Sequence, residues 1–413
     1  MKVQVSDGVR KALNVLLCVV AVAGTGFGGR EIWQVWDARR QIDAACAGLV
    51  PAGRVLALSP AGGTITARQA EEGTIELESL ASGQDCELFS TEAGEKTGTD
   101  SGQRWFFTGA VGVMPPDERE TPEDPWDQIE DPFGHYTYPD QPLGGGIAGR
   151  VTDSGVVVEL PCPTGKVNGQ RISTLWARAT LMSGRPFTER EQPTAHDRNV
   201  LAQTAVLTAN NLADRLGCPD RLPDPPDDTP ALTPGPTPAS RAAGTCAWYR
   251  EAGFPRDRDL ADQVLESRTD ARLWDERCVL VLSRSRANTV WFGHTGTLRG
   301  VDSPSRPGQW FVSLHTYSGD HAKNVRLHTG GSTDPGTRAE PGKAGRGGGD
   351  PAWWASSVCE GRAQIHTMTA AYGYDKVVTP ELEKVFRSYV DDVTDRRGCT
   401  DVTMPAPATF RAD

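Results

Sequence analysis

The sequence predicts an α+β fold with two related domains, each a mostly antiparallel sheet with packed helices, preceded by one transmembrane helix. Two apolar-periodic stretches end in the same pattern, Asp-Arg-x-Gly-Cys, at residues 214–218 and 395–399. A proline-rich stretch separates the two halves of the chain, and four cysteines lie on each side of it, apart from Cys18. Together these features indicate that one type of domain occurs twice in the chain.

The N-terminal segment predicts a membrane anchor. Residues 12–29 carry no charge and follow Lys2, Arg10 and Lys11. A run of about 18 residues is at the lower limit of a bilayer span, and positive flanks stay cytoplasmic. We therefore expect a short cytoplasmic tail at residues 1–11, a transmembrane anchor at 12–29 and an extracytoplasmic C-terminus. A cleaved signal peptide is the alternative, although its apolar core would be shorter than the usual run of about 7 to 15 residues.

The eight remaining cysteines predict disulfide bonds. An even number of cysteines outside the cytoplasm is typical of a disulfide framework. Zinc is the alternative, but no two of the eight form a C-x-x-C pair. Each set of four allows three connectivities, and related domains should share one, for which we choose first with second and third with fourth. The expected pairs are Cys46–Cys86, Cys162–Cys218, Cys246–Cys278 and Cys359–Cys399.

Residues 30–221 are expected to form the first extracytoplasmic domain. Residues 30–58 are expected as a helix that leaves the membrane and is broken at Gly48 and Pro51. Apolar residues three or four positions apart predict a second helix at about 188–216. Alternating polar and apolar residues between turn signals predict strands. These strands are expected at residues 64–67, 74–80, 85–90, 104–111, 156–160 and 170–182. The acidic, proline-containing stretch 115–134 is expected to be a solvated loop, with a calcium site as the alternative.

Residues 222–243 are expected to form a stiff linker, because proline locks φ and favours an extended chain. The second α+β domain then covers residues 244–405, and 406–413 form a tail. Helices are expected at 257–273 and from Thr379 to the glycine at 398. Strands are expected at residues 277–283, 288–298, 309–317, 324–329 and 363–371. Gln309-Trp-Phe resembles Arg104-Trp-Phe, although Val290-Trp-Phe competes for the same place in the repeat.

The sequence contains no recognisable catalytic motif. A net charge of −11 argues against nucleic acid as a partner, because phosphate binding needs a basic surface. The chain has neither G-x-S-x-G nor H-E-x-x-H, and we expect no cofactor. Five of its seven histidines lie in the second domain. Four of them fall on predicted strands and could share a metal or ligand surface, or have no role: His294, His315, His328 and His366.

This organisation, with the stretch Cys46-Ala-Gly-Leu-Val-Pro, resembles uncharacterised membrane-anchored, cysteine-framed envelope proteins of actinobacteria. Ala47 departs from the C-G-L-x-P pattern of those proteins, and the resemblance implies no activity. We expect an extracytoplasmic binding or accessory protein of the bacterial cell envelope, whose partner is an envelope protein or a cell-wall component. The alternatives are an extracellular hydrolase with an unmarked active site and a structural spacer.

Overall fold

The structure is a computed structural model of the 413-residue chain. It describes residues 7–59, 61–67, 74–96, 103–114, 138–182, 192–233, 235–305, 308–327, 336–347 and 351–411. The expected acidic loop at 115–134 and His328 lie outside these residues.

The described strands form two eight-stranded antiparallel sheets and two small hairpins. The first sheet runs in the order β1 (Ile65–Ala67), β2 (Gln84–Ser90), β4 (Arg104–Met114), β10 (Thr174–Leu181), β7 (Gly155–Pro161), β6 (Ile147–Val151) and β5 (Gln141–Gly144), with β3 (Glu95–Lys96) beside β4. The second runs in the order β11 (Thr237–Pro238), β12 (Gln263–Glu266), β13 (Asp275–Val281), β14 (Phe311–Ser318), β19 (Arg362–Ala370), β18 (Ala352–Cys359) and β17 (Gly345–Arg346), with β20 (Thr400–Thr403) beside β18. The hairpins join β8 (Lys166–Val167) to β9 (Gln170–Arg171) and β15 (Arg326–Leu327) to β16 (Thr337–Arg338).

The two large sheets share the order of their connections. In the first, β2 leads to its neighbour β4, the chain then passes through β6 and β7, and β10 returns between β7 and β4. In the second, β13 leads to β14, the chain passes through β17 and β18, and β19 returns between β18 and β14. This order matches Arg104-Trp-Phe at the start of β4 with Gln309-Trp-Phe at the start of β14, whereas Val290-Trp-Phe lies in a helix.

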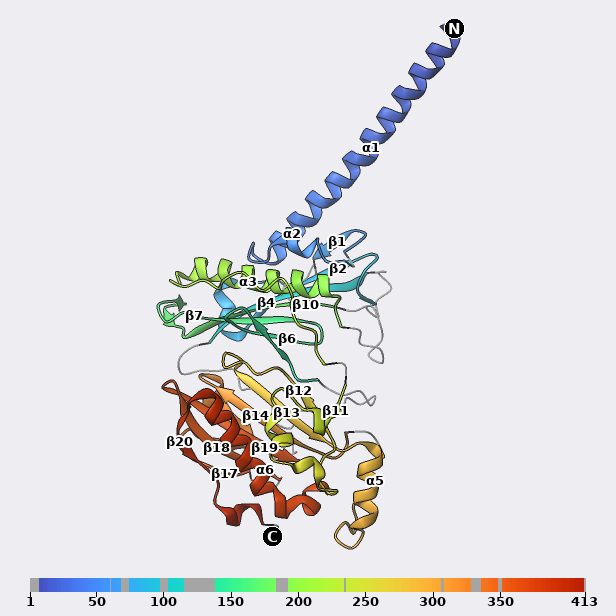
Figure 1. The fold of residues 1–413 in the computed structure, drawn as a ribbon. Helices are drawn as coiled ribbons and strands as arrows, with labels where there is room; N and C mark the ends of the chain where they lie inside the picture. The colour runs from blue at the N-terminus through green and yellow to red at the C-terminus, as the bar shows by residue number, and fades with distance from the viewer. Residues whose placement is uncertain are drawn as a thin grey trace.

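One long helix covers one face of each sheet. The helix α3 (Ala195–Leu216) packs on β7 and β10 of the first sheet, and α6 (Tyr374–Arg397) packs on β14, β18 and β19 of the second. The C-terminal end of the helix α1 (Asp7–Ala45) packs beside β1, with Ile42 and Ala45 in the core, and the rest of the helix projects away from the sheets (Figure 1). Shorter helices are α2 (Ala52–Val55), α4 (Ala247–Glu251) and α5 (Arg284–Gly293), with 3-10 turns η1 (Leu77–Ser82), η2 (Ala239–Arg241), η3 (Phe254–Arg256), η4 (His321–Asn324) and η5 (Pro407–Phe410).

The predicted fold class is wrong, because the structure is mostly antiparallel sheet with few helices. Short strands such as β5, β6, β17 and β20 are not predicted, since they contain too few residues to show alternation. The strand β18 is not predicted because it is buried on both faces and therefore does not alternate between polar and apolar residues. The predicted transmembrane helix is also not found: no helix among the described residues is long and apolar enough to cross a bilayer.

Two elements of the second half differ in type from the prediction. Residues 288–298 were expected as a strand, but α5 occupies residues 284–293, because the Ser283 side chain accepts a hydrogen bond from the backbone N–H of Arg286 and caps a helix. Residues 257–273, expected as a helix, consist of turns around β12. The last helix begins at Tyr374, five residues before Thr379, and carries Pro380 inside it.

The four disulfide bonds join the pairs that the sequence predicts: Cys46–Cys86, Cys162–Cys218, Cys246–Cys278 and Cys359–Cys399. Both long helices also end as expected, with Gly217 and Gly398 in the left-handed conformation directly before a bonded cysteine. Four such bonds are typical of an oxidising, extracytoplasmic compartment.

The expected linker lies along α3 and is held there by side chains of that helix. Asn199 bonds to the backbone of Asp227 and Thr229, and Asn210 bonds to the backbone of Leu222 in both directions. Thr233, near the end of the segment, donates to the carbonyl of Glu266 on β12. The segment therefore connects the two halves while remaining in contact with both.

A buried ion pair fixes α6 to its sheet. Glu276 on β13 is fully buried, and its carboxylate accepts hydrogen bonds from Arg396 at 2.5 Å and from Arg397 at 2.8 Å. Burial acts to raise the pKa of Glu276, but the two guanidinium groups outweigh it and lower that pKa. The arginines belong to the helix-ending pattern, which therefore carries an ionic contact as well as a cysteine.

We expect Glu276→Gln to lower the free energy of unfolding by about 3–5 kcal/mol at pH 7, because it leaves the 4% exposed Arg397 without its buried counter-charge. Chemical denaturation measures this loss. The loss should shrink as pH falls below 4.5, the ordinary pKa of the carboxyl, because protonation of Glu276 removes the same charge in the wild type. Glu251→Gln, which breaks an exposed pair with Arg250, is the control. An equal effect of the two substitutions would contradict the assignment.

Candidate functional site

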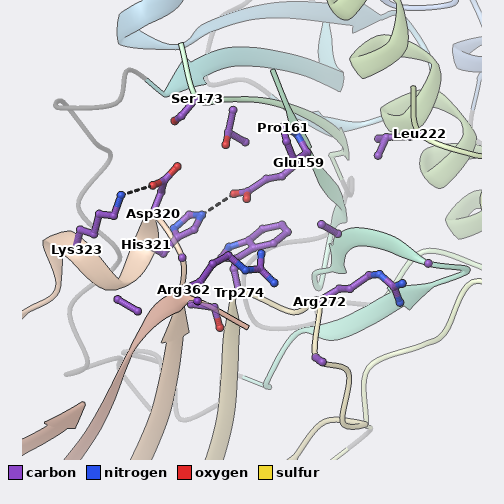
Figure 2. A pocket seen from close by; sticks show the side chains of 18 residues that line it. Glu159, Pro161, Ser173, Leu222, Arg272, Trp274, Asp320, His321, Lys323 and Arg362 are labelled. Carbon is purple, nitrogen blue, oxygen red and sulfur yellow. Dashed lines mark hydrogen bonds and ion pairs between the residues drawn. The ribbon is translucent and has the colours of Figure 1, made fainter. Parts of the chain in front are cut away.

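A pocket of about 590 Å³ lies between the two sheets (Figure 2). The first sheet contributes Glu159 and Pro161 of β7 and Thr174 of β10. The second half contributes Trp274, directly before β13, together with His321 and Lys323 of η4 and Arg362 at the start of β19. A pocket of this size lies within the range of small-molecule sites.

The two halves meet at this pocket through an ion pair. Glu159 Oε1 lies 2.6 Å from His321 Nε2, and the two side chains are only 13% and 12% exposed. The side chain of Glu159 points away from α3, because Val158 and Leu160 on the other face of β7 join the core beneath that helix. The imidazole of His321 also stacks on the indole of Trp274 at 5.5 Å, and the guanidinium of Arg150 lies 5.5 Å from the same indole.

The contact with Glu159 changes the pKa of His321. Burial acts to lower the pKa of His321, but the carboxylate of Glu159 outweighs burial and raises that pKa above 6.5. The contact therefore favours the imidazolium over the neutral ring, and the hydrogen bond between the two side chains is mostly shielded from water. Such a pair resists separation of the two sheets at the pocket.

The remaining charges of the pocket are mostly basic. Asp320 accepts a hydrogen bond from Lys323 at 2.9 Å, so these two charges offset one another. Arg272 is exposed, and its guanidinium makes no hydrogen bond or ion pair with any described residue. Among the described residues, Arg362 forms an ion pair only with Glu360, at 3.6 Å, and both of these side chains are more than half exposed.

A second contact between the halves lies beside the pocket. Gln141 on β5 is buried, its amide oxygen accepts from the backbone N–H of Arg268, and its amide nitrogen donates to the carbonyl of Glu266. The side-chain amide of Gln141 thus bonds to a backbone carbonyl and a backbone N–H at the end of β12, as the backbone of a neighbouring strand would. Together with the pair of Glu159 and His321, it connects the first half of the chain to the second.

The structure describes three of the four histidines of the expected surface, His294, His315 and His366, and does not bring them together. His315 pairs with Thr367 and His366 pairs with Thr316 in the register of β14 and β19, so the two imidazoles point to opposite faces of the sheet. His366 is fully buried between Thr316 and Ser357, and burial lowers its pKa to about 3. His294 follows α5 and pairs with Asp259 at 3.1 Å. Among the described residues, no cluster of His, Cys, Asp or Glu could hold a metal ion.

His315 takes part in a chain of serine, histidine and aspartate. Ser313 Oγ lies 3.2 Å from His315 Nε2, and His315 Nδ1 lies 2.9 Å from Asp275 Oδ1. Burial acts to raise the pKa of Asp275, but His315, Arg150 and Arg277 together lower that pKa. The order of the groups is that of a hydrolase triad. However, Ser313 and His315 are each 1% exposed, and neither lines the pocket at Trp274.

Sequence reasoning does not find the pocket, because its residues come from separate parts of the chain. Glu159 and His321 are 162 positions apart and lie in no common motif. His321 falls outside the predicted strands, which led us to exclude it from the expected ligand surface. The one available signal is its place in Gly319-Asp320-His321, since turn residues in a connecting loop position functional side chains more often than core strands do.

The pair of Glu159 and His321 predicts a stability that depends on pH. Because the folded state raises the pKa of His321, its contribution is fully present below about pH 6.5 and is lost as the pH rises through the folded pKa. His321→Gln should therefore cost about 1.5–3 kcal/mol at pH 6 and clearly less at pH 9. Denaturation of both proteins across this range measures the difference. His294→Gln, which removes a more exposed histidine pair, is the control. A cost that is constant with pH would contradict the ionic role.

Comparison with protein-family models, with curated proteins and with solved structures finds no match to this chain. Any function must therefore be inferred from the side chains of this protein. Two features are candidates: the pocket between the two sheets, which the pair of Glu159 and His321 joins, and the buried hydrogen-bonded residues Ser313, His315 and Asp275.

Proposed function

We propose that the protein is an extracytoplasmic binding or accessory protein of the cell envelope and that its binding site is the pocket between the two sheets. The observation that carries the proposal is the composition of this pocket. It combines an aromatic wall, Trp274, with side chains that can bind a polar ligand, and its opposite walls belong to different sheets. Such interfaces between domains are preferred places for ligand sites.

The contacts around the pocket support binding without a large change of shape. The pair of Glu159 and His321 and the two bonds of Gln141 already connect the walls. A preformed site loses less conformational entropy when a ligand binds. The proposed ligand is an envelope protein segment or a cell-wall component, because the disulfides belong to an extracytoplasmic protein. Attachment to a membrane is supported only by the uncharged sequence run 12–29.

Photo-crosslinking in the producing cells tests this proposal. A photoreactive residue in place of Ala271, which is exposed and lines the pocket, should capture an envelope component. The same residue in place of Arg387, on the outer side of α6, serves as the control and should not capture it. Identical adducts from the two positions, or no adduct from either, would contradict binding at the pocket and favour a structural spacer.

Hydrolysis is a second candidate function, favoured by the contacts of Ser313, His315 and Asp275 alone. The roles would follow from the geometry: His315 would take the proton of Ser313, and Asp275 would stabilise the charged imidazole. The burial of Ser313 opposes this function, since a nucleophile must touch its substrate.

We expect no labelling of the protein by a fluorophosphonate probe, because the probe cannot reach the 1% exposed Ser313. Ser313→Ala should instead lower the free energy of unfolding by about 1 kcal/mol through the lost hydrogen bond to His315. Mass spectrometry of the treated protein measures labelling. Covalent modification of wild-type Ser313 that is absent from Ser313→Ala would establish the hydrolase over the binding protein.

A further inference from the structure

We infer that the pocket between the sheets is an anion site, and that Arg272 and Arg362 bind the carboxylate or phosphate of a small acidic saccharide or a ligand of similar size. This inference rests on the proposed binding function and names its ligand class. It follows from which charges of the pocket are already neutralised and which are not.

Both acidic side chains of the pocket are already engaged. The carboxylate of Glu159 is 2.6 Å from His321, and the carboxylate of Asp320 is 2.9 Å from Lys323. An incoming cation would have to displace the ring of His321 or the ammonium of Lys323 to reach either of them. The pocket is therefore not arranged to receive a cationic ligand.

Arg272 and Arg362 are the pocket residues whose charges are not neutralised by a close buried partner. The guanidinium of Arg272 makes no hydrogen bond or ion pair with any described residue, and the exposed contact of Arg362 with Glu360 is worth little in free energy. A guanidinium presents a planar set of N–H donors that matches a carboxylate or a phosphate. Two such groups at one pocket contrast with the chain as a whole, whose net charge is −11. A local excess of positive charge in an acidic protein selects anions at that place.

The volume of the pocket and its other lining residues indicate the size and the uncharged groups of the ligand. A volume of about 590 Å³ exceeds what a single inorganic anion fills, and the pocket is also lined by Trp274, Ser173 and Thr174. Hydroxyl groups can bond to the hydroxyls of a sugar, and an indole edge can pack against its apolar face. An acidic sugar has groups that match each of these side chains, and Figure 2 shows Ser173, Trp274, Arg272 and Arg362 lining the pocket.

Calorimetry on the full chain with matched pairs of probes tests the inference. N-acetylmuramic acid carries a carboxylate that N-acetylglucosamine lacks, and glucose 6-phosphate carries a phosphate that glucose lacks. We expect the acidic member of at least one pair to bind at least tenfold more tightly than the neutral member, and the pair that responds identifies the anion. Raising the salt concentration should weaken this binding, because the two arginines are exposed to solvent.

Arg272→Gln and Arg362→Gln should each weaken binding of the acidic probe about tenfold, the usual effect of losing one charged hydrogen bond. Arg387→Gln, on the far surface of α6, should leave it unchanged. Since both arginines are exposed, unfolding curves of the variants should match the wild type. Equal binding of acidic and neutral sugars would overturn the anion class while keeping the binding function. Absence of binding by every probe would overturn the anion class too, whereas the crosslink from position 271 reports on the binding function separately.

Discussion

The pocket depends on one nearly buried contact between the two halves, the pair of Glu159 and His321, which acts together with the hydrogen bonds of Gln141 and Thr233. Moving two charges out of water costs several kcal/mol each, and the cost is recovered only when the partners meet in good geometry. A shift of one sheet along the other would leave both charges buried and unpaired, so the contact selects one placement. The pocket exists because of that placement, since its walls come from both sheets and neither half contains it alone.

The same logic explains why polar residues gather on both faces of the second sheet. On the face beneath α6, Glu276 holds two arginines, and the neutral His366 links Thr316 to Ser357. On the other face, Asp275 and His315 lie close to Arg150 of the first sheet. Buried polar groups of this kind are costly unless each has a partner. Their partners come from distant segments, so each pair specifies which segment packs on which face.

What the sequence could predict was determined by local chemistry. The helix ends at Gly217 and Gly398 follow from the left-handed conformation that glycine favours, and the cysteine pairs follow from comparing two halves with the same pattern. The site could not be predicted in this way, because the face on which His315 or His366 lies depends on the register between β14 and β19. The error in fold class has another cause, because buried strands such as β18 show no alternation and were not expected from the sequence. The opposite error occurs at α5, where strand-forming residues form a helix that Ser283 caps.

The chain of Ser313, His315 and Asp275 and the pocket are parts of one polar interior, and their exposure separates their roles. Asp275 follows Trp274 of the pocket wall, and its charge is shared among His315, Arg150 and Arg277. His315 is stacked on Tyr317 at 5.4 Å, which leaves its ring no face free for a substrate on that side. The hydroxyls of Thr367 and Thr369, opposite His315 and Ser313 on β19, are buried without a hydrogen-bond partner. A triad in use needs an open approach to its serine, whereas a support for the pocket wall needs only fixed hydrogen bonds. A ligand can contact the exposed side chains of Arg272 and Arg362 but not the buried hydroxyl of Ser313. We therefore propose that the pocket, and not Ser313, binds the ligand.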